Sequence, residues 1–559
     1  MDVGELLDYK PPQALKRPVD VDEDDDEIEK TKKMRRIARA KANKMARAPS
    51  PTPSLQTLDQ ITDEERAEIL KFVETEQTQG EVVDEATIKK IVLNFEKRSL
   101  RNREMRIKFP DSPERFMDSE VELHEILQEM RVLATAPDYY PLLVRLQVIP
   151  SLLELLAHDN TDISVATVEL IQELTDVDIL NESEEGAEAL LEALLDHQII
   201  ALLVQNLERL DESVKEEADG VHNTLSIVEN LTELKSEITT EAGKQGLLGW
   251  LLRRLKVKGP FDANKLYASE MMSILLQDNE KNRTMLGEMD GIDTLLQQLA
   301  FYKRHDPASA EEHEYMENLF NCLCSALMVM PNRDKFLKGE GLQLMNLMLR
   351  EKKTSRNGSL KVLDYAMSGP FGKDNCNKFV DILGLRTIFP LFMKTPKKNR
   401  KRVLSTEEHE EHVCSIIASM LRNCKGPQRQ RLISKFTEND HEKVDRLLEL
   451  HFKYLEKVDA VDGALNEEDN EDDDDAIYLK RLEGGLFTLQ LVDYIIIEVC
   501  NCGSPSIKQR AVQILNLRGA SLKTIKHVMR EYAGNLGDEG DQEWRDEEQQ
   551  HILNLVDKF

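Results

Sequence analysis

The segment Val148-Ile149-Pro150-Ser151-Leu152-Leu153-Glu154-Leu155-Leu156 is the first copy of an apolar phrase that returns along the chain. Similar segments follow it, and their aligned positions are Ile149, Ile199, Leu247, Ile292, Leu342 and Leu385. The steps between them are 50, 48, 45, 50 and 43 residues, and each copy has helical spacing. Such a period is typical of α-solenoids of the armadillo or HEAT type. The sequence therefore predicts an all-α, right-handed armadillo-type superhelix that presents a long surface to other chains.

The chain divides into four predicted parts around this repeat. Residues 1–80 have runs of like charge and no apolar period, so we expect a disordered tail. Residues 81–140 should form an N-terminal helical cap, because a stack cannot leave an apolar end exposed to water. We expect the repeats over residues 141–425 and further helices with a cap over residues 426–559. Within this last part, residues 458–476 are strongly acidic and are predicted to be a solvated loop.

Local signals indicate how the helices are joined. The string Asp159-Asn160-Thr161-Asp162 predicts a turn and an N-cap before a helix. Glycines also lie just ahead of several copies of the phrase, where we expect them to let the chain bend sharply. These glycines are Gly243, Gly246, Gly291, Gly341 and Gly384.

The overall charge limits the kind of partner. The chain has 104 acidic and 74 basic residues, which gives a formal net charge of -30. Such a surface repels nucleic-acid phosphates and attracts basic proteins, so we expect no general nucleic-acid binding by the body of the protein. Seven cysteines, an odd number, do not suggest a disulfide framework and favour a reducing compartment.

The sequence gives no sign of a membrane segment. Met1–Glu5 is not followed by the apolar run of a signal peptide. The most apolar stretch, Leu486–Cys502, is interrupted by Gln490, Asp493 and Glu498, so we expect a buried helix. A soluble intracellular protein is the prediction.

The candidate partner-binding residues lie on the last helices of the first two repeat units. Steps of three or four residues back from Asn230 and from Glu173 define two matching polar stripes. Carboxylates there would attract lysine and arginine side chains of an extended partner, and asparagine amides could hold its backbone. An ordinary solvated helix face is the alternative interpretation. The groove residues are Asp162, Glu169, Glu173, Glu216, Asp219, Asn223 and Asn230.

The tail holds a candidate nuclear localisation signal in two basic clusters. An import receptor could bind them in two pockets; the alternative is a charged tail with no targeting role. Ser50 and Thr52 each precede proline and are candidate phosphorylation sites, where added negative charge would weaken receptor binding. The basic charge continues to Arg47 and could touch RNA. The signal residues are Lys16, Arg17, Lys30, Lys32, Lys33, Arg35 and Arg36.

Six strings, in order along the chain, carry a more specific likeness. They are Lys90–Arg98, Arg106–Asp111, His158–Asp162, Val204–Lys215, Pro260–Tyr267 and Phe336–Leu342. From about residue 84 to the C-terminus the chain resembles the beta-catenin-like family of nuclear armadillo proteins. The resemblance implies a nuclear location and association with the Prp19/CDC5-like complex of the pre-mRNA splicing machinery. It also implies binding to localisation-signal-like basic segments of CDC5-like and other splicing factors, and of activation-induced deaminase where that enzyme exists.

The chain departs from import receptors of the same fold, which place tryptophan beside asparagine in the groove. One turn before Asn230 and Glu173 it has Ser226 and Glu169, and its tryptophans are Trp250 and Trp544. Basic segments would therefore bind mainly through charge, with moderate, salt-sensitive affinity. An importin-like transport adaptor for basic cargo remains the alternative to a scaffold.

No enzyme, cofactor or metal site is predicted. The string Gly243-x-x-Gly246-x-x-Gly249 lacks the preceding strand that a dinucleotide site requires. His409-Glu410-Glu411-His412 has the wrong spacing for a metalloprotease helix, and a polar helix start explains it. The sequence thus favours a non-enzymatic scaffold whose oligomeric state stays open.

Overall fold

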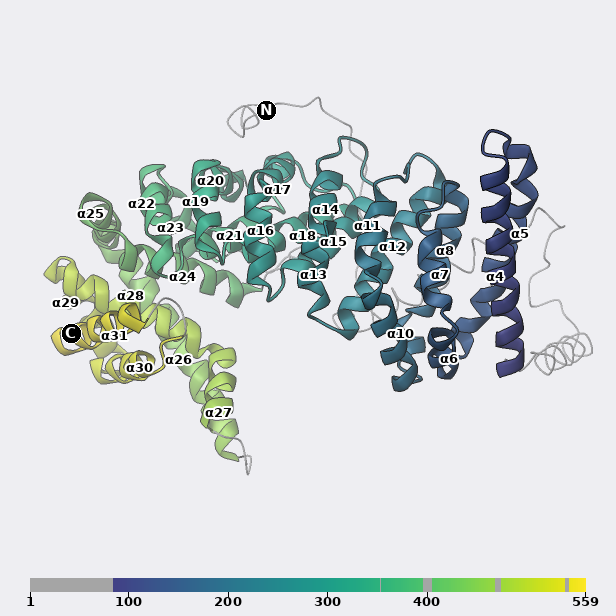
Figure 1. Ribbon diagram of the computed structural model, residues 1–559. Helices are drawn as coiled ribbons and strands as arrows, with labels where there is room; N and C mark the ends of the chain where they lie inside the picture. Colours follow the sequence, from purple (N-terminus) through teal and green to yellow (C-terminus); the bar gives the residue numbers. More distant parts are fainter. Residues whose placement is uncertain (1–83, 352, 396–404, 468–473, 538–541) are drawn as a thin grey trace, which may run out of the picture. The chain divides into compact units, whose positions relative to one another are not determined.

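A computed structural model describes residues 84–351, 353–395, 405–467, 474–537 and 542–559 (Figure 1). These residues form helices and no strand. The predicted localisation signal and the candidate phosphorylation sites Ser50 and Thr52 lie outside the described residues. The first described helices are α4 (Glu85–Lys108) and α5 (Met117–Met130), followed by the short 3₁₀ segment η3 (Arg131–Thr135).

Every copy of the apolar phrase forms the second helix of a three-helix unit. One helix precedes it and a longer helix follows it. The units are α6 (Tyr140–Arg145), α7 (Val148–Leu155) and α8 (Thr161–Leu174); α10 (Glu184–Asp196), α11 (Ile199–Leu207) and α12 (Lys215–Leu234); α13 (Ile238–Lys244), α14 (Leu247–Lys256) and α15 (Ala263–Leu276); α16 (Glu280–Glu288), α17 (Gly291–Leu299) and α18 (Ala310–Ala326); α19 (Met330–Lys338), α20 (Gly341–Glu351) and α21 (Arg356–Met367); and α22 (Lys373–Asp381), α23 (Leu385–Met393) and α24 (Thr406–Asn423). The short helix α9 (Val177–Leu180) joins the first two units.

The third helices of successive units pack side by side. Helix α5 packs on α8, α8 on α12, α12 on α15, and this continues through α18 and α21 to α24 (Figure 1). Each unit buries its apolar face against its neighbours, which is how a solenoid builds a continuous core. The predicted armadillo-type α-solenoid is therefore confirmed.

The turns before the phrase helices differ from the expectation about glycine. The residue with left-handed backbone is Asp290 (φ 57°), Glu340 (φ 60°) or Leu383 (φ 66°), one position ahead of each glycine. The glycines after them serve close packing: a Cβ at Gly341 would lie 2.3 Å from the Phe336 ring. Among the glycines named above, only Gly246 (φ 103°) has the left-handed conformation that was expected.

The C-terminal part contains helices that continue the packing beyond the repeats. They are α25 (Gly426–Ser434), α26 (Glu442–Glu467), α27 (Asp474–Arg481), α28 (Phe487–Cys502), α29 (Pro505–Leu517), α30 (Leu522–Gly534) and α31 (Gln542–Lys558). The segment Asp475–Cys502 is long and apolar enough to cross a membrane, but 78% of its apolar window is buried inside the protein. It is a core helix, in agreement with the prediction for Leu486–Cys502.

The loop predicted over residues 458–476 is wrong at both of its ends, because helix α26 continues to Glu467 and α27 begins at Asp474. Residues 468–473 lie outside the described residues. The helix continues because Val458 is buried and Asp462 forms an ion pair with Arg481 at 2.8 Å. Helix α26 therefore has apolar and ionic contacts with neighbouring residues, which its acidic composition did not indicate.

Candidate partner-binding groove

Four of the seven predicted groove residues line one pocket between α5, α8 and α12. Its volume is about 710 Å³. The side chains that line it include no lysine or arginine, and the charged ones are carboxylates. These carboxylates belong to Glu114, Glu120, Asp162, Glu169, Glu216 and Asp219. We call this feature the acidic pocket.

The acidic pocket is positioned by the starts of two helices. Asn160, within the string predicted to form a turn and an N-cap, is the N-cap of α8, and its side chain accepts a hydrogen bond from the backbone N–H of Asp162 at 3.0 Å. Glu217, in the first turn of α12, accepts hydrogen bonds from the Thr161 hydroxyl at 2.9 Å and from the Asp211 N–H at 2.6 Å. Acidic residues are favourable in a first turn because they face the positive end of the helix dipole. The two helix starts are thereby held in register.

Four of the pocket carboxylates are exposed and form no ion pair with a described residue. They are Glu114, Asp162, Glu216 and Asp219. Glu120 differs, because it pairs with Arg106 and accepts a hydrogen bond from the Asn160 amide at 2.9 Å. The exposed four are the groups best able to meet a cationic guest.

Glu169 and Glu173 are bound instead by an arginine of the same chain. Arg131, at the start of η3, donates from Nε to Glu173 at 2.7 Å and from Nη1 to Glu169 at 3.2 Å. Arg131 Nη1 also donates to the Gln128 side-chain oxygen at 3.0 Å. The hydrogen bond with Glu173 is the main cause that raises the pKa of Arg131, against the opposing effect of burial. The chain itself thus supplies a cation for these two carboxylates, which were predicted to attract lysine or arginine side chains of another protein.

The asparagines do not share the pocket with the carboxylates. Asn223 and Asn230 lie farther along α12, half-buried, and neither lines the acidic pocket. Their amides make no hydrogen bond with a described residue, so they stay candidates for backbone contacts.

Two apolar side chains of the pocket were not predicted as part of the groove. Met117 and Val121, one turn apart on α5, are 57% and 54% exposed and line the pocket beside the carboxylates. Their spacing was visible in the sequence, but nothing there indicated that α5 contributes a wall to the groove. Such a wall can accept the methylene stem of a lysine or arginine.

The import-receptor arrangement of aromatic slots is not reproduced at the described tryptophans. Trp250 lies on α14, the second helix of its unit, and is only 6% exposed. Trp544 lies on α31, beyond the repeats. Neither can form a row of slots along the third helices.

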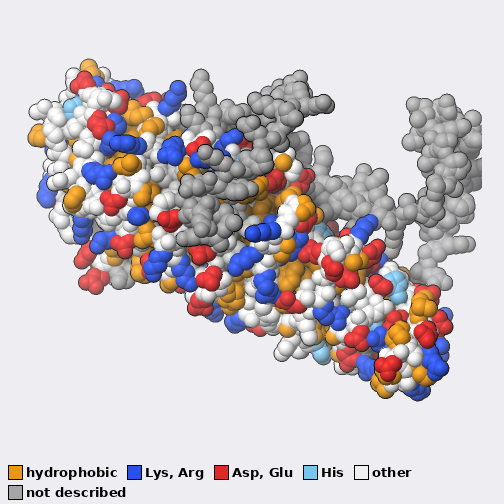
Figure 2. Space-filling model, turned by 90° about the horizontal axis from the view of Figure 1, so that it is seen from above, with side chains coloured by type: hydrophobic (Ala, Val, Ile, Leu, Met, Phe, Trp, Pro, Cys, Tyr) orange, Lys and Arg blue, Asp and Glu red, His pale blue; other side chains and the backbone are white. Residues whose placement is uncertain are grey.

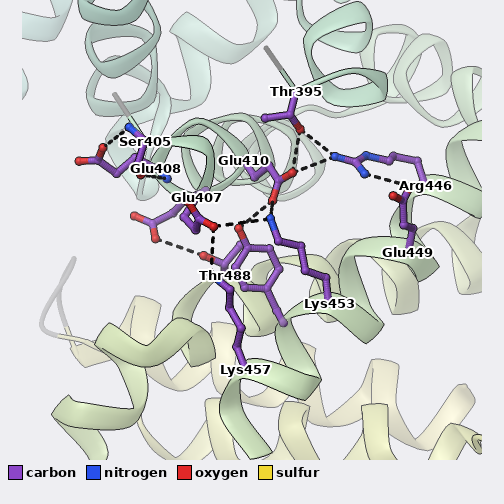
Figure 3. Close-up of polar contacts among 12 residues, drawn as sticks. Thr395, Ser405, Glu407, Glu408, Glu410, Arg446, Glu449, Lys453, Lys457 and Thr488 are labelled. Carbon is purple, nitrogen blue, oxygen red and sulfur yellow. Dashed lines mark hydrogen bonds and ion pairs between the residues drawn. The ribbon is translucent and has the colours of Figure 1, made fainter. Parts of the chain in front are cut away.

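A second concentration of charge surrounds the buried Glu410 of α24 and joins α24 to α26 (Figure 3). Glu410 accepts hydrogen bonds from Thr395 and Lys453, both at 2.7 Å, and from Tyr454 at 2.8 Å. Arg446 adds an ion pair at 3.0 Å. Burial acts to raise the pKa of Glu410, but these hydrogen bonds outweigh it and lower the pKa below its usual value. The cluster is internally satisfied, which fits a structural joint.

The described residues contain no group of three or more His, Cys, Asp or Glu side chains arranged to hold a metal ion.

Figure 2 shows acidic, basic and hydrophobic side chains interspersed on the face that it displays. On that face charges of both signs are mixed, whereas the lining of the acidic pocket includes no lysine or arginine.

A family model and individual relatives assign the chain to the same family. Residues 67–530 match the family described as "Catenin-beta-like, Arm-motif containing nuclear". The chain is 62% identical to human Beta-catenin-like protein 1 over 487 residues, covering 85% of this chain and 86% of that protein. It is 32% identical over 450 residues to the Beta-catenin-like protein 1 homolog of Schizosaccharomyces pombe, covering 79% and 78%.

Among solved structures, one from work on the phosphorylation-controlled interaction of cadherin with beta-catenin has a TM-score of 0.43 and 12% identity. It covers 74% of this chain and 66% of that one. The family assignment rests on the sequence matches, which span most of the chain. The chain belongs to the catenin-beta-like family of nuclear proteins with Arm motifs.

Proposed function

We propose that this protein is a non-enzymatic nuclear scaffold that binds basic, localisation-signal-like segments of partner proteins in the acidic pocket. The observation that carries the proposal is a pocket with six carboxylates and no lysine or arginine in its lining. The nuclear description of the family supports the location. The sequence resemblance supports a place in pre-mRNA splicing, with CDC5-like and other splicing factors as partners and activation-induced deaminase as a further one.

The acidic pocket suits a lysine- or arginine-rich chain in two ways. Asp162, Glu216 and Asp219 offer unpaired charge at the surface, where each contact with a cation contributes up to about 1 kcal/mol. Met117 and Val121 offer apolar surface for the side-chain stems. Because the carboxylates are exposed, salt should weaken the binding strongly.

An importin-like adaptor is the competing function. The buried position of Trp250 argues against it, because tight cargo capture by import receptors depends on aromatic slots. An adaptor would also shuttle between compartments and release its cargo, whereas a scaffold would remain in the nucleus with its complex. Photobleaching of the tagged protein in living cells separates these two behaviours.

The binding test uses a fluorescent peptide with two lysine- and arginine-rich clusters and the full-length protein. We expect Glu216→Gln with Asp219→Asn to weaken binding about fivefold at low salt, since two exposed charge contacts of about 0.5 kcal/mol each are lost. The control is Glu184→Gln with Glu185→Gln, which removes two exposed carboxylates from the first turn of α10. Equal affinity in both double variants would reject the acidic pocket as the binding site.

The splicing role has a separate test. A nuclear-extract pull-down with the wild-type protein should recover splicing factors, and the Glu216/Asp219 variant should recover fewer of them than the Glu184/Glu185 control. Recovery that is independent of the pocket would place the partner contacts elsewhere on the chain.

A further inference from the structure

None of the described residues covers an apolar stripe on α4, the first described helix. The helix packs on α5 through Ile88, Val92 and Phe95, which are at most 6% exposed. The opposite side carries Leu93, Leu100 and Ile107, which are 69%, 55% and 74% exposed. These three are seven residues apart, so they lie on one face of the helix and span about 21 Å along it. We call them the α4 stripe.

A terminal helix that only closed the stack would present a polar outer face, because capping helices meet water. The α4 stripe breaks this rule in a regular pattern. Exposed apolar side chains that line up along one helix are typical of a surface that another helix covers.

The charges beside the stripe indicate what kind of helix would fit. Helix α4 carries eight basic and three acidic residues, although the whole chain has a net charge of -30. Six of the eight basic residues pair with carboxylates of the same chain. Lys90 and Lys97 are exposed and form no ion pair with a described residue. Lys97 is four residues after Leu93 and three before Leu100, so it lies next to the stripe. The acidic neighbours of the stripe are Glu96 and Glu104, and Glu104 pairs with Lys108. Lys90 and Lys97 are thus positive charges beside the stripe that no described carboxylate neutralises.

A second copy of this chain is a poor occupant for the stripe. Pairing α4 with another α4 would bring the unpaired Lys90 and Lys97 of both copies to one interface, and like charges across an interface are unfavourable. A basic peptide of the kind proposed for the acidic pocket would be repelled in the same way. The complementary occupant is an amphipathic helix whose apolar face is bordered by aspartate and glutamate.

We propose that the outer face of α4 is a docking site for an acidic amphipathic helix of a partner protein. Apolar side chains of the partner pack on Leu93, Leu100 and Ile107, and its carboxylates meet Lys90 and Lys97. This site is distinct from the acidic pocket and selects partners of the opposite charge. One protein can then hold a basic segment and an acidic helix at the same time.

The test uses the full-length protein and a designed, fluorescein-labelled helical peptide of 21 residues. Its leucines recur every three or four residues, so that they repeat every seven and form one face, and glutamates border that face. A second peptide has lysine in place of every glutamate. We expect the protein to bind the glutamate peptide at least about tenfold more tightly than the lysine peptide, as charge complementarity requires. The variant Lys90→Glu with Lys97→Glu should reverse this preference.

The contribution of the apolar stripe is tested by Leu93→Ser with Leu100→Ser. This double variant should bind the glutamate peptide about tenfold more weakly. The matched control is Leu517→Ser on α29, a leucine that is 79% exposed. All these positions are at the surface, and circular dichroism melts check that the variants fold. No binding of the glutamate peptide, or equal loss in the Leu517→Ser control, would overturn the proposal.

Two further outcomes would show that something other than a partner's helix covers the α4 stripe, and either would overturn the proposal. A concentration-dependent dimer in light scattering, abolished by Leu100→Glu, would make a second copy the occupant. Tighter peptide binding after changing Asp24, Asp25 and Asp26 to asparagine would make the chain's own acidic run the occupant. A monomer with unchanged affinity in that variant supports the proposal.

Discussion

Removal of the Arg131 charge should strengthen the binding of basic segments. Arg131 holds Glu169 and Glu173 in the way that an arginine of a partner would, with Nε 2.7 Å from a Glu173 oxygen. It therefore competes with any cationic guest for these carboxylates. In Arg131→Met the apolar stem of the side chain is retained, and the groove gains one negative charge.

The magnitude follows from the burial of the three groups. The side chains of Arg131, Glu169 and Glu173 are 23%, 32% and 31% exposed, so water screens the contact in part. Two unit charges 4 Å apart interact by about 4 kcal/mol at an effective dielectric constant of about 20, which is an upper bound. Partly exposed pairs contribute nearer about 1 kcal/mol, which corresponds to roughly fivefold tighter binding of a guest.

The assay is fluorescence anisotropy with the basic peptide at about 50 mM and about 1 M salt, where the Debye length falls to about 3 Å. The gain should be present at low salt and lost at high salt. Arg101→Met is the control, because Arg101 pairs with Glu122 at 2.6 Å and neither residue lines the pocket. Unchanged affinity of Arg131→Met at low salt, or the same gain in Arg101→Met, would refute the reasoning.

Three further predictions concern stability. Gly341→Ala should destabilise the fold by about 1–3 kcal/mol in urea unfolding, because the added methyl meets the buried Phe336 ring. Gly463→Ala in α26 meets no atom within 4 Å and should stabilise by about 0.5–1 kcal/mol. Glu410 has a lowered pKa in the folded state, so its contribution is present above the unfolded value of 4.5 and is lost as the pH falls through the folded value. Glu410→Gln should therefore lower stability at neutral pH and reduce the loss of stability on acidification, as pH-dependent thermal melts would record.

The repeat could be predicted because helix periodicity is local. Ile199 and Leu247 were aligned by their apolar neighbours, and they are the first residues of α11 and α14. The spacing of leucines within each phrase fixes which side of the helix is buried, and a period in the forties leaves room for two more helices in each unit. The N-cap of α8 was likewise located within the string 159–162, since a cap depends on a few adjacent residues.

The pairing of side chains across units could not be predicted in the same way. Arg131 and Glu173 are 42 residues apart, and the sequence gives no register between η3 and α8. Gly341 was expected to make a turn, whereas the turn belongs to Glu340 and the glycine makes room for Phe336. In each case the missing information is the distance of one helix from the next, which depends on packing and not on composition.

The charge at the start of the solenoid illustrates why a net charge is a poor guide to partners. Helix α5 packs on α4 and also contributes Met117 and Glu120 to the acidic pocket, so a basic and an acidic surface meet at one helix pair. Arg106 of α4 pairs with both Glu120 and Asp159 and neutralises charge at the boundary between them. The charges left unpaired on each side, Lys90 on α4 and Asp219 in the pocket, are of opposite sign. A total of -30 averages over these two surfaces, whereas their separation is what would allow one short stretch of solenoid to choose two kinds of partner.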